Sequence, residues 1–249
     1  MKKNLYAAAV FSLLVGGLAH ADEAKPDNEL SFNAAATSDY RFRGISQSRL
    51  QSAVQGGIDY LNNPTGLYVG TWLSTIKWTK DDGGSGSIEW DVYAGQRGQI
   101  SADVSYDIGA VSYIYPSNSL SSVPGLVNAN TTELYGQISY GPAYLKYSQS
   151  VTNLFGFVES KNSDYLDAGA NFDLGNGNTL NLHAGHQQIK NASTANYSDW
   201  KIGVTRDFEV VSVALAAIGT NAEKTAYASP ANGKFLGKSA LVFSVSKMF

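Results

Sequence analysis

Several segments of the sequence alternate strictly between apolar and polar residues, and this pattern most constrains the fold. Between positions 88 and 94 the even residues are apolar, whereas Glu89, Asp91 and, further along, Arg97 occupy odd positions. Residues 164–174 and 199–208 show the same alternation. Successive side chains of a β-strand point to opposite faces, so each segment is predicted to form a strand with one apolar and one polar face.

Weaker alternation elsewhere raises the prediction to about twelve strands, an even number typical of bacterial outer-membrane barrels. A shift of apolar parity at Gly109 predicts a β-bulge there. Short and long connections alternate along the chain, which places both ends of the barrel chain on the short-turn side. We therefore predict an all-β protein, a transmembrane antiparallel up-and-down β-barrel. The predicted strands span residues 30–43, 52–61, 66–74, 88–97, 101–115, 132–140, 143–150, 164–174, 179–187, 199–208, 211–219 and 239–249.

The N-terminus has the features of an export signal. Lys2 and Lys3 precede an apolar run at 5–18, and Ala19-His20-Ala21 forms a small-x-small cleavage box. We expect a cleaved signal peptide at 1–21 and a barrel at 22–249, in the outer membrane of a Gram-negative bacterium. An uncleaved anchor is the alternative, disfavoured because the apolar run is short. The sequence contains no cysteine, so neither a disulfide nor a thiolate zinc site is possible.

The polar face carries too many charges for a dry core, because burying an isolated charge is costly. We therefore expect this face to line a hydrated lumen. It holds ten acidic and five basic residues, which favours a weak preference for cations or neutral solutes. The pore-lining candidates are Asp39, Arg41, Arg43, Asp59, Glu89, Asp91, Arg97, Glu133, Lys146, Asp167 and Lys201, and the same face carries Asp103, Asp107, Asp173 and Asp199.

Two arginines form a candidate cluster near the outer mouth. Arg41 and Arg43 are two positions apart, so a strand would direct both to the side of Asp39. They are expected to pair with Glu89 or Asp91. The cluster either sets a constriction or forms a structural ion network across the lumen.

The last strand and the aromatic residues also favour a membrane barrel. Phe243, Val245 and the terminal Phe249 share one face, which resembles the C-terminal signature that the barrel-assembly machinery recognises, although Lys247 departs from it. Aromatic residues near strand ends are typical of interfacial girdles, with ordinary strand propensity as the alternative. They are Tyr40, Phe42, Tyr60, Tyr115, Tyr140, Tyr197, Trp200 and Phe208.

The segment 36–47, with the sequence ATSDYRFRGISQ, resembles the start of the TorF-type porins of proteobacteria. Segments 88–95, 113–116, 133–135 and 245–249 support the resemblance, which runs over nearly the whole chain after the signal segment. It implies an outer-membrane pore, linked in some members to small respiratory substrates such as trimethylamine oxide. It implies no catalytic residues.

The predicted function is a porin-like channel for passive diffusion of small hydrophilic solutes. A barrel of about twelve strands is narrow, so a closed structural or adhesive barrel is the alternative, with loop 116–131 able to fold inward. An outer-membrane lipid-modifying enzyme is disfavoured because His183 and His186 face opposite sides of one strand and no serine nucleophile motif accompanies them. We expect no cofactor and no metal site. The expected partners are outer-membrane lipid, the barrel-assembly machinery and small polar solutes, and a net charge of -3 argues against nucleic acid. No decisive apolar interface indicates an oligomer.

Overall fold

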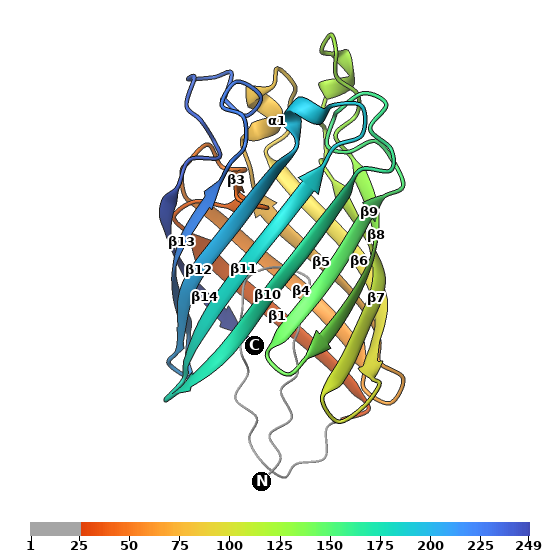
Figure 1. Cartoon of the computed structure of the whole chain (residues 1–249), viewed down its shortest axis with the longest axis vertical. Helices are drawn as coiled ribbons and strands as arrows, with labels where there is room; N and C mark the ends of the chain where they lie inside the picture. Colours follow the sequence, from red (N-terminus) through yellow and green to blue (C-terminus); the bar gives the residue numbers. More distant parts are fainter. Residues whose placement is uncertain (1–25) are drawn as a thin grey trace.

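The computed structural model of the chain describes residues 26–249, which form a closed β-barrel (Figure 1). The predicted signal peptide at 1–21 lies outside the described residues. Twelve antiparallel strands make the wall, as predicted. They are β1 (Asn28–Thr37), β4 (Ala53–Asn62), β5 (Leu67–Thr75), β6 (Ile88–Gln99), β7 (Val104–Ile114), β8 (Thr131–Tyr140), β9 (Ala143–Ser150), β10 (Asp164–Gly175), β11 (Asn178–Gln188), β12 (Tyr197–Asp207), β13 (Ser212–Thr220) and β14 (Ala240–Met248).

Each wall strand pairs with its neighbour in sequence, and β1 closes the cylinder by pairing with β14. The predicted bulge at Gly109 is wrong, because Gly109 pairs with Gly95 and with Tyr135 in a continuous register. A Cβ at this position would lie 2.6 Å from the hydroxyl of Tyr135 and 2.6 Å from the carbonyl oxygen of Ala94. The glycine therefore makes room for an inward tyrosine ring and does not mark a bulge.

The two faces of the wall have the predicted alternation. Trp90 and Val92 are exposed on the outside, whereas Glu89 and Asp91, their neighbours along β6, are at most 1% exposed. The same alternation exposes Ile202 of β12 and buries Asp199. An apolar outer wall on a sheet with no free edges meets the requirements of a hydrocarbon environment, where every backbone group needs an internal partner. Among residues 26–249, no helix has the length and apolarity needed to cross a membrane.

Long and short connections lie at opposite ends of the barrel, as the sequence predicts. The short-turn end holds residues 63–66, 100–103, 141–142, 176–177 and 208–211. At this end Asn28, the first residue of β1, pairs with Asn62, the last residue of β4. The other end carries the long loops, with α1 (Trp78–Asp81), η1 (Leu120–Ser122) and η2 (Ser193–Ala195) (Figure 1).

The predicted first strand at 30–43 is too long. β1 ends at Thr37, and residues 38–52, here named the inner hairpin, leave the wall. Within it β2 (Arg41–Phe42) pairs with β3 (Ile45–Ser46), and Arg43 and Gly44 form the tip with φ values of 47° and 78°. Two successive positive φ values define the tight turn whose twist suits a two-residue hairpin, and the glycine permits it.

Aromatic rings fill the barrel interior beneath the long loops. Tyr40 contacts Trp72 edge-on at 5.5 Å, and Phe42 contacts Tyr113 at 5.4 Å and Phe155 at 5.5 Å. The girdle prediction is therefore wrong for half of its members. Tyr40, Tyr115 and Tyr197 are buried and Phe42 packs against the core cluster, whereas Tyr60, Tyr140, Trp200 and Phe208 are exposed.

Candidate functional site

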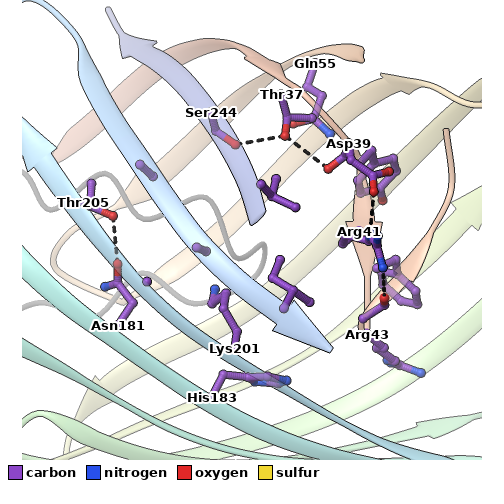
Figure 2. A pocket seen from close by; sticks show the side chains of 18 of the residues that line it. Thr37, Asp39, Arg41, Arg43, Gln55, Asn181, His183, Lys201, Thr205 and Ser244 are labelled. Atoms are coloured by element: carbon purple, nitrogen blue, oxygen red, sulfur yellow. Dashed lines mark hydrogen bonds and ion pairs between the residues drawn. The ribbon is translucent and has the colours of Figure 1, made fainter. Parts of the chain in front are cut away.

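A cavity of about 190 Å³ lies inside the barrel. The inner hairpin forms one side of it, and the inward faces of β9–β14 form much of the rest. Figure 2 shows Lys201 and His183 on the wall strands, with Asp39, Arg41 and Arg43 of the inner hairpin across from them. The cavity therefore lies inside the barrel, between the inner hairpin and the wall strands.

Arg43, at the tip of the inner hairpin, links three parts of the structure. Its Nη1 and Nη2 donate to the two carboxylate oxygens of Glu133 on β8, at 3.0 and 2.6 Å, and Nη1 also donates to Gln187 Oε1 on β11 at 2.6 Å. The guanidinium lies 4.2 Å from the ring centre of Tyr165 and 4.7 Å from that of Phe42. A two-pronged arginine–carboxylate pair fixes orientation as well as charge. The hairpin tip is thereby fixed against the wall across the lumen.

Arg41 anchors the base of the same hairpin. Its Nε donates to Asp39 at 2.6 Å, and its Nη1 donates to the carbonyl oxygens of Leu236 and Lys238, each at 3.0 Å. Asp39 also accepts a hydrogen bond of 2.5 Å from Ser46. Arg41 therefore fastens the hairpin to the loop before β14.

The predicted pairing of Arg41 and Arg43 with Glu89 or Asp91 is wrong. That prediction assumed an extended strand through residue 43, in which both arginines share a face. The turn at Arg43 and Gly44 separates them, and Glu89 instead accepts a hydrogen bond from the hydroxyl of Tyr40 at 2.6 Å.

Tyrosine hydroxyls cover several carboxylates on the wall formed by β4–β7. Tyr93 donates to Asp59 and Tyr68 donates to Asp107, both at 2.5 Å. Asp91 is fully buried, and neither of its carboxylate oxygens has a hydrogen-bond partner in the described part of the chain. Phenol donors, more than cations, therefore satisfy this acidic side of the lumen.

The opposite wall combines a histidine with two carboxylates. His183 Nδ1 lies 2.8 Å from Asp167, and its Nε2 lies 2.7 Å from Asp199. Tyr165 donates to the second oxygen of Asp199 at 2.8 Å. With carboxylate oxygens at both ring nitrogens, His183 has the surroundings of an imidazolium donor.

Lys146 and Lys201 line the cavity on either side of this group. Within residues 26–249 neither ammonium has a carboxylate oxygen within 4.0 Å, although the Nζ of Lys146 lies 4.1 Å from the ring centre of Tyr135. These two lysines are the cavity's cations without a direct ion pair. In the described residues no group of three or more histidine, aspartate or glutamate side chains has an arrangement that could hold a metal ion.

The structure brings most of the predicted polar face together on the inside of the barrel. Asp103 and Asp173 differ, because both are exposed near the short turns, and this leaves eight acidic and five basic residues of the original set. The sequence analysis placed His183 and His186 on opposite faces of one strand but did not propose His183 as a site residue, and it missed Gln187 and Tyr165. The available signal was parity along the strand. Tyr165 shares its face of β10 with Asp167, and Gln187 shares its face of β11 with His183.

A closed twelve-stranded barrel with a polar interior and an apolar exterior defines a porin-like fold, and solved porins share it. The KdgM porin aligns with a TM-score of 0.54 and 7% identity, over 88% of this chain and 98% of its own. The NanC porin aligns with a TM-score of 0.53 and 8% identity, over the same shares of the two chains. A KdgM structure in complex with disordered oligogalacturonate gives the same values as the first.

Residues 21–249 match the model of a family described as bacterial protein of unknown function (Gcw_chp), and the chain belongs to that family. No curated protein matches the chain. The family match covers the whole barrel, including the inner hairpin and the final strand.

Proposed function

We propose that this protein is an outer-membrane channel for the passive diffusion of small hydrophilic solutes, narrowed by the inner hairpin. The observation that carries the proposal is a polar cavity inside a closed barrel, bounded by a hairpin whose Arg43 contacts β8 and β11. A polar interior admits water and solutes, and a segment folded into it limits their size. The porin fold of the structural relatives supports the same reading.

The proposed location rests on three features. The outer wall is apolar, the N-terminal 1–21 segment has a signal-peptide pattern, and Phe243 of β14 and the terminal Phe249 are exposed, at 49% and 66%. With Val245 they form the proposed signature for the barrel-assembly machinery. The resemblance to TorF-type porins belongs to the same proposal.

The proposed selectivity is a weak preference for cations or neutral solutes. Eight inward acidic residues against five basic ones support it, because an excess of one sign attracts counter-ions to a narrow lumen. Reversal potentials across a KCl gradient test it directly. A clear anion preference in dilute KCl would reject this part of the proposal and leave the channel itself intact.

The decisive experiment is reconstitution of the refolded protein. We expect small discrete conductance steps in planar bilayers, and liposome swelling that is faster with small polyols than with disaccharides. The matched control is a heat-unfolded sample of the same protein in the same detergent. Folded protein that gives neither conductance nor swelling would reject the channel.

A closed structural or adhesive barrel is the second candidate, and the packing of the interior favours it. The bidentate Arg43–Glu133 pair and the edge-on contacts of Phe42 with Tyr113 and Phe155 lie inside the barrel at the level of the hairpin. In that case the long loops, not the lumen, would carry the function. Absence of solute flux together with retained heat-modifiable migration on a gel would support this candidate.

A further inference from the structure

The cavity contains two positively charged side chains whose nearest acidic neighbours are engaged by other groups. Asp107 accepts a hydrogen bond from Tyr68, whereas Asp167 and Asp199 contact His183. An ammonium carries three donors and has no acceptor of its own. Lys146 and Lys201 line the cavity together with Asp39 and Asp167, but in the described structure no carboxylate oxygen lies within 4.0 Å of either ammonium.

The two lysines lie at comparable depth. In the strand register, Lys146 lies opposite Gln137 of β8, which is four positions from Glu133. Lys201 lies opposite His183 of β11, which is four positions from Gln187. Four residues of strand correspond to about 13 Å. Because Glu133 and Gln187 are the two wall partners of Arg43, both lysines lie on the short-turn side of the hairpin tip.

Neutral polar groups complete this side of the cavity, beside Asp167 and His183. Ser148, Asn181 and Thr205 line it, and Thr205 donates to Asn181 at 2.8 Å. A volume of about 190 Å³ holds several water molecules or one small organic molecule. Asp167 acts electrostatically on both ammonium groups, but neither makes a direct ion pair, so each keeps donors for an anion that fits this space.

We propose that this cavity binds a small carboxylate-bearing solute through the ammonium groups of Lys146 and Lys201. The proposal deepens the proposed function and rests on it for the route by which the solute arrives. It is compatible with an overall acidic lumen, because a local anion site retains a solute while the net charge governs the flow of free ions. A carboxylate bound there would hinder the ion current.

The test uses the full refolded protein with succinate as the probe, and succinamide as its neutral isostere. Calorimetry in detergent micelles should show saturable binding of succinate and none of succinamide. Succinate should also reduce the KCl current through the channel. The Lys146→Met and Lys201→Met variants should each weaken binding about tenfold or more, as expected for a charge-assisted hydrogen bond in a partly dry site.

Three further variants make the result specific. Lys190→Met removes a charge from an exposed loop outside the cavity and should leave binding unchanged. Lys201→Arg should retain most of the affinity, and Lys201→Gln serves if the methionine variant fails to fold. Heat-modifiable migration reports the folding of each variant.

The outcomes separate the two proposals. Binding of succinate that is insensitive to both lysine variants, or no saturable binding by wild type, overturns the carboxylate site. If KCl current is present in that case, the channel stands without the site. If succinate binds through the lysines and no current flows, the site stands and the channel proposal fails.

Discussion

The guanidinium of Arg43 and the carboxylate of Glu133 meet inside the barrel through two nitrogen–oxygen contacts of 3.0 and 2.6 Å. Their side chains are 7% and 1% exposed. Arg43 comes from the hairpin that leaves the wall after β1, and Glu133 comes from β8, seven strands away around the cylinder in one direction. This pair therefore fixes the tip of the hairpin against β8.

Breaking this pair should both destabilise and open the barrel. Arg43→Met leaves Glu133 buried without its cation, a change that typically costs about 3–5 kcal/mol. We expect lower stability in urea unfolding and a larger single-channel conductance. Adding Glu133→Gln to the first change should restore part of the stability, because both charges are then absent.

A matched control is Arg206→Met, which removes an arginine near the short turns where the side chain stacks on Phe208. It should change neither conductance nor stability by a comparable amount. Unchanged conductance in Arg43→Met, with the fold intact, would assign Arg43 to a structural network and not to the constriction.

A charge-neutral change at the hairpin tip should give a similar opening. A Cβ at Gly44 would lie 2.8 Å from the Cβ of Asp199 and still closer to Thr220, and φ is +78°. Gly44→Val should therefore displace the tip from the wall and raise the conductance without altering the charge of the lumen. Gly233→Val, at a loop glycine with positive φ and open space around it, is the control for backbone strain alone. If Gly44→Val conducts like wild type, as the control Gly233→Val should, the hairpin tip does not limit the flow of ions.

The outward face should not tolerate charge. Ile202 lies in the middle of β12 and is 55% exposed, and a lysine there would meet hydrocarbon if the barrel spans a membrane. The expected cost of Ile202→Lys is about 2–4 kcal/mol in lipid vesicles. Ala226→Lys, in an exposed loop, should be neutral. Equal stability of the two variants in vesicles would contradict the lipid-facing wall.

The long-loop end should respond to mild acid. Burial raises the pKa of Asp82 to about 6, with a contribution from the neighbouring Asp81. A carboxyl group whose pKa is higher in the folded state than in the unfolded chain favours folding while it is protonated. Stability contributed by Asp82 should therefore fall as pH rises from about 4 to 6.

Thermal unfolding of wild type and Asp82→Asn at pH 4, 5, 6 and 7 measures this effect. The difference in melting temperature should shift in favour of the variant across that window and stay constant above it. A difference that is independent of pH would show that Asp82 titrates as it does in the unfolded chain. Asp27→Asn, at a group close to the short-turn end, provides a carboxylate-to-amide control.

The wall of the barrel was predictable because its information is local. Alternation along β6, β10 and β12 identified strands and faces, since period two follows from the geometry of a single strand. The order of long and short connections then predicted which end of the barrel carries the short turns and which carries the long loops. Each of these inferences needs only neighbouring residues in the sequence.

The interior was less predictable because its contacts join distant positions. Arg43 and Glu133 are ninety positions apart, so no local pattern relates them. The parity argument also failed where the strand ended, because nothing in the alternation of residues 30–43 indicates that the wall stops at Thr37. The pair Arg43-Gly44 was the available signal, since a glycine among polar residues suits a tight turn.

The inner hairpin also has a mechanical consequence for the cylinder that encloses it. β1 and β14 are joined over five residue pairs, from Asn33–Met248 to Thr37–Ser244, whereas β1 and β4 are joined over ten. Arg41 bonds the hairpin to the carbonyl groups that directly precede β14. The hairpin thus reinforces the junction between neighbouring strands that has the fewest residue pairs. Moving the hairpin out of the lumen would break its hydrogen bonds to the segment before β14. A wider lumen therefore requires either movement of side chains at the hairpin tip or a loosening of the barrel at the junction between β1 and β14.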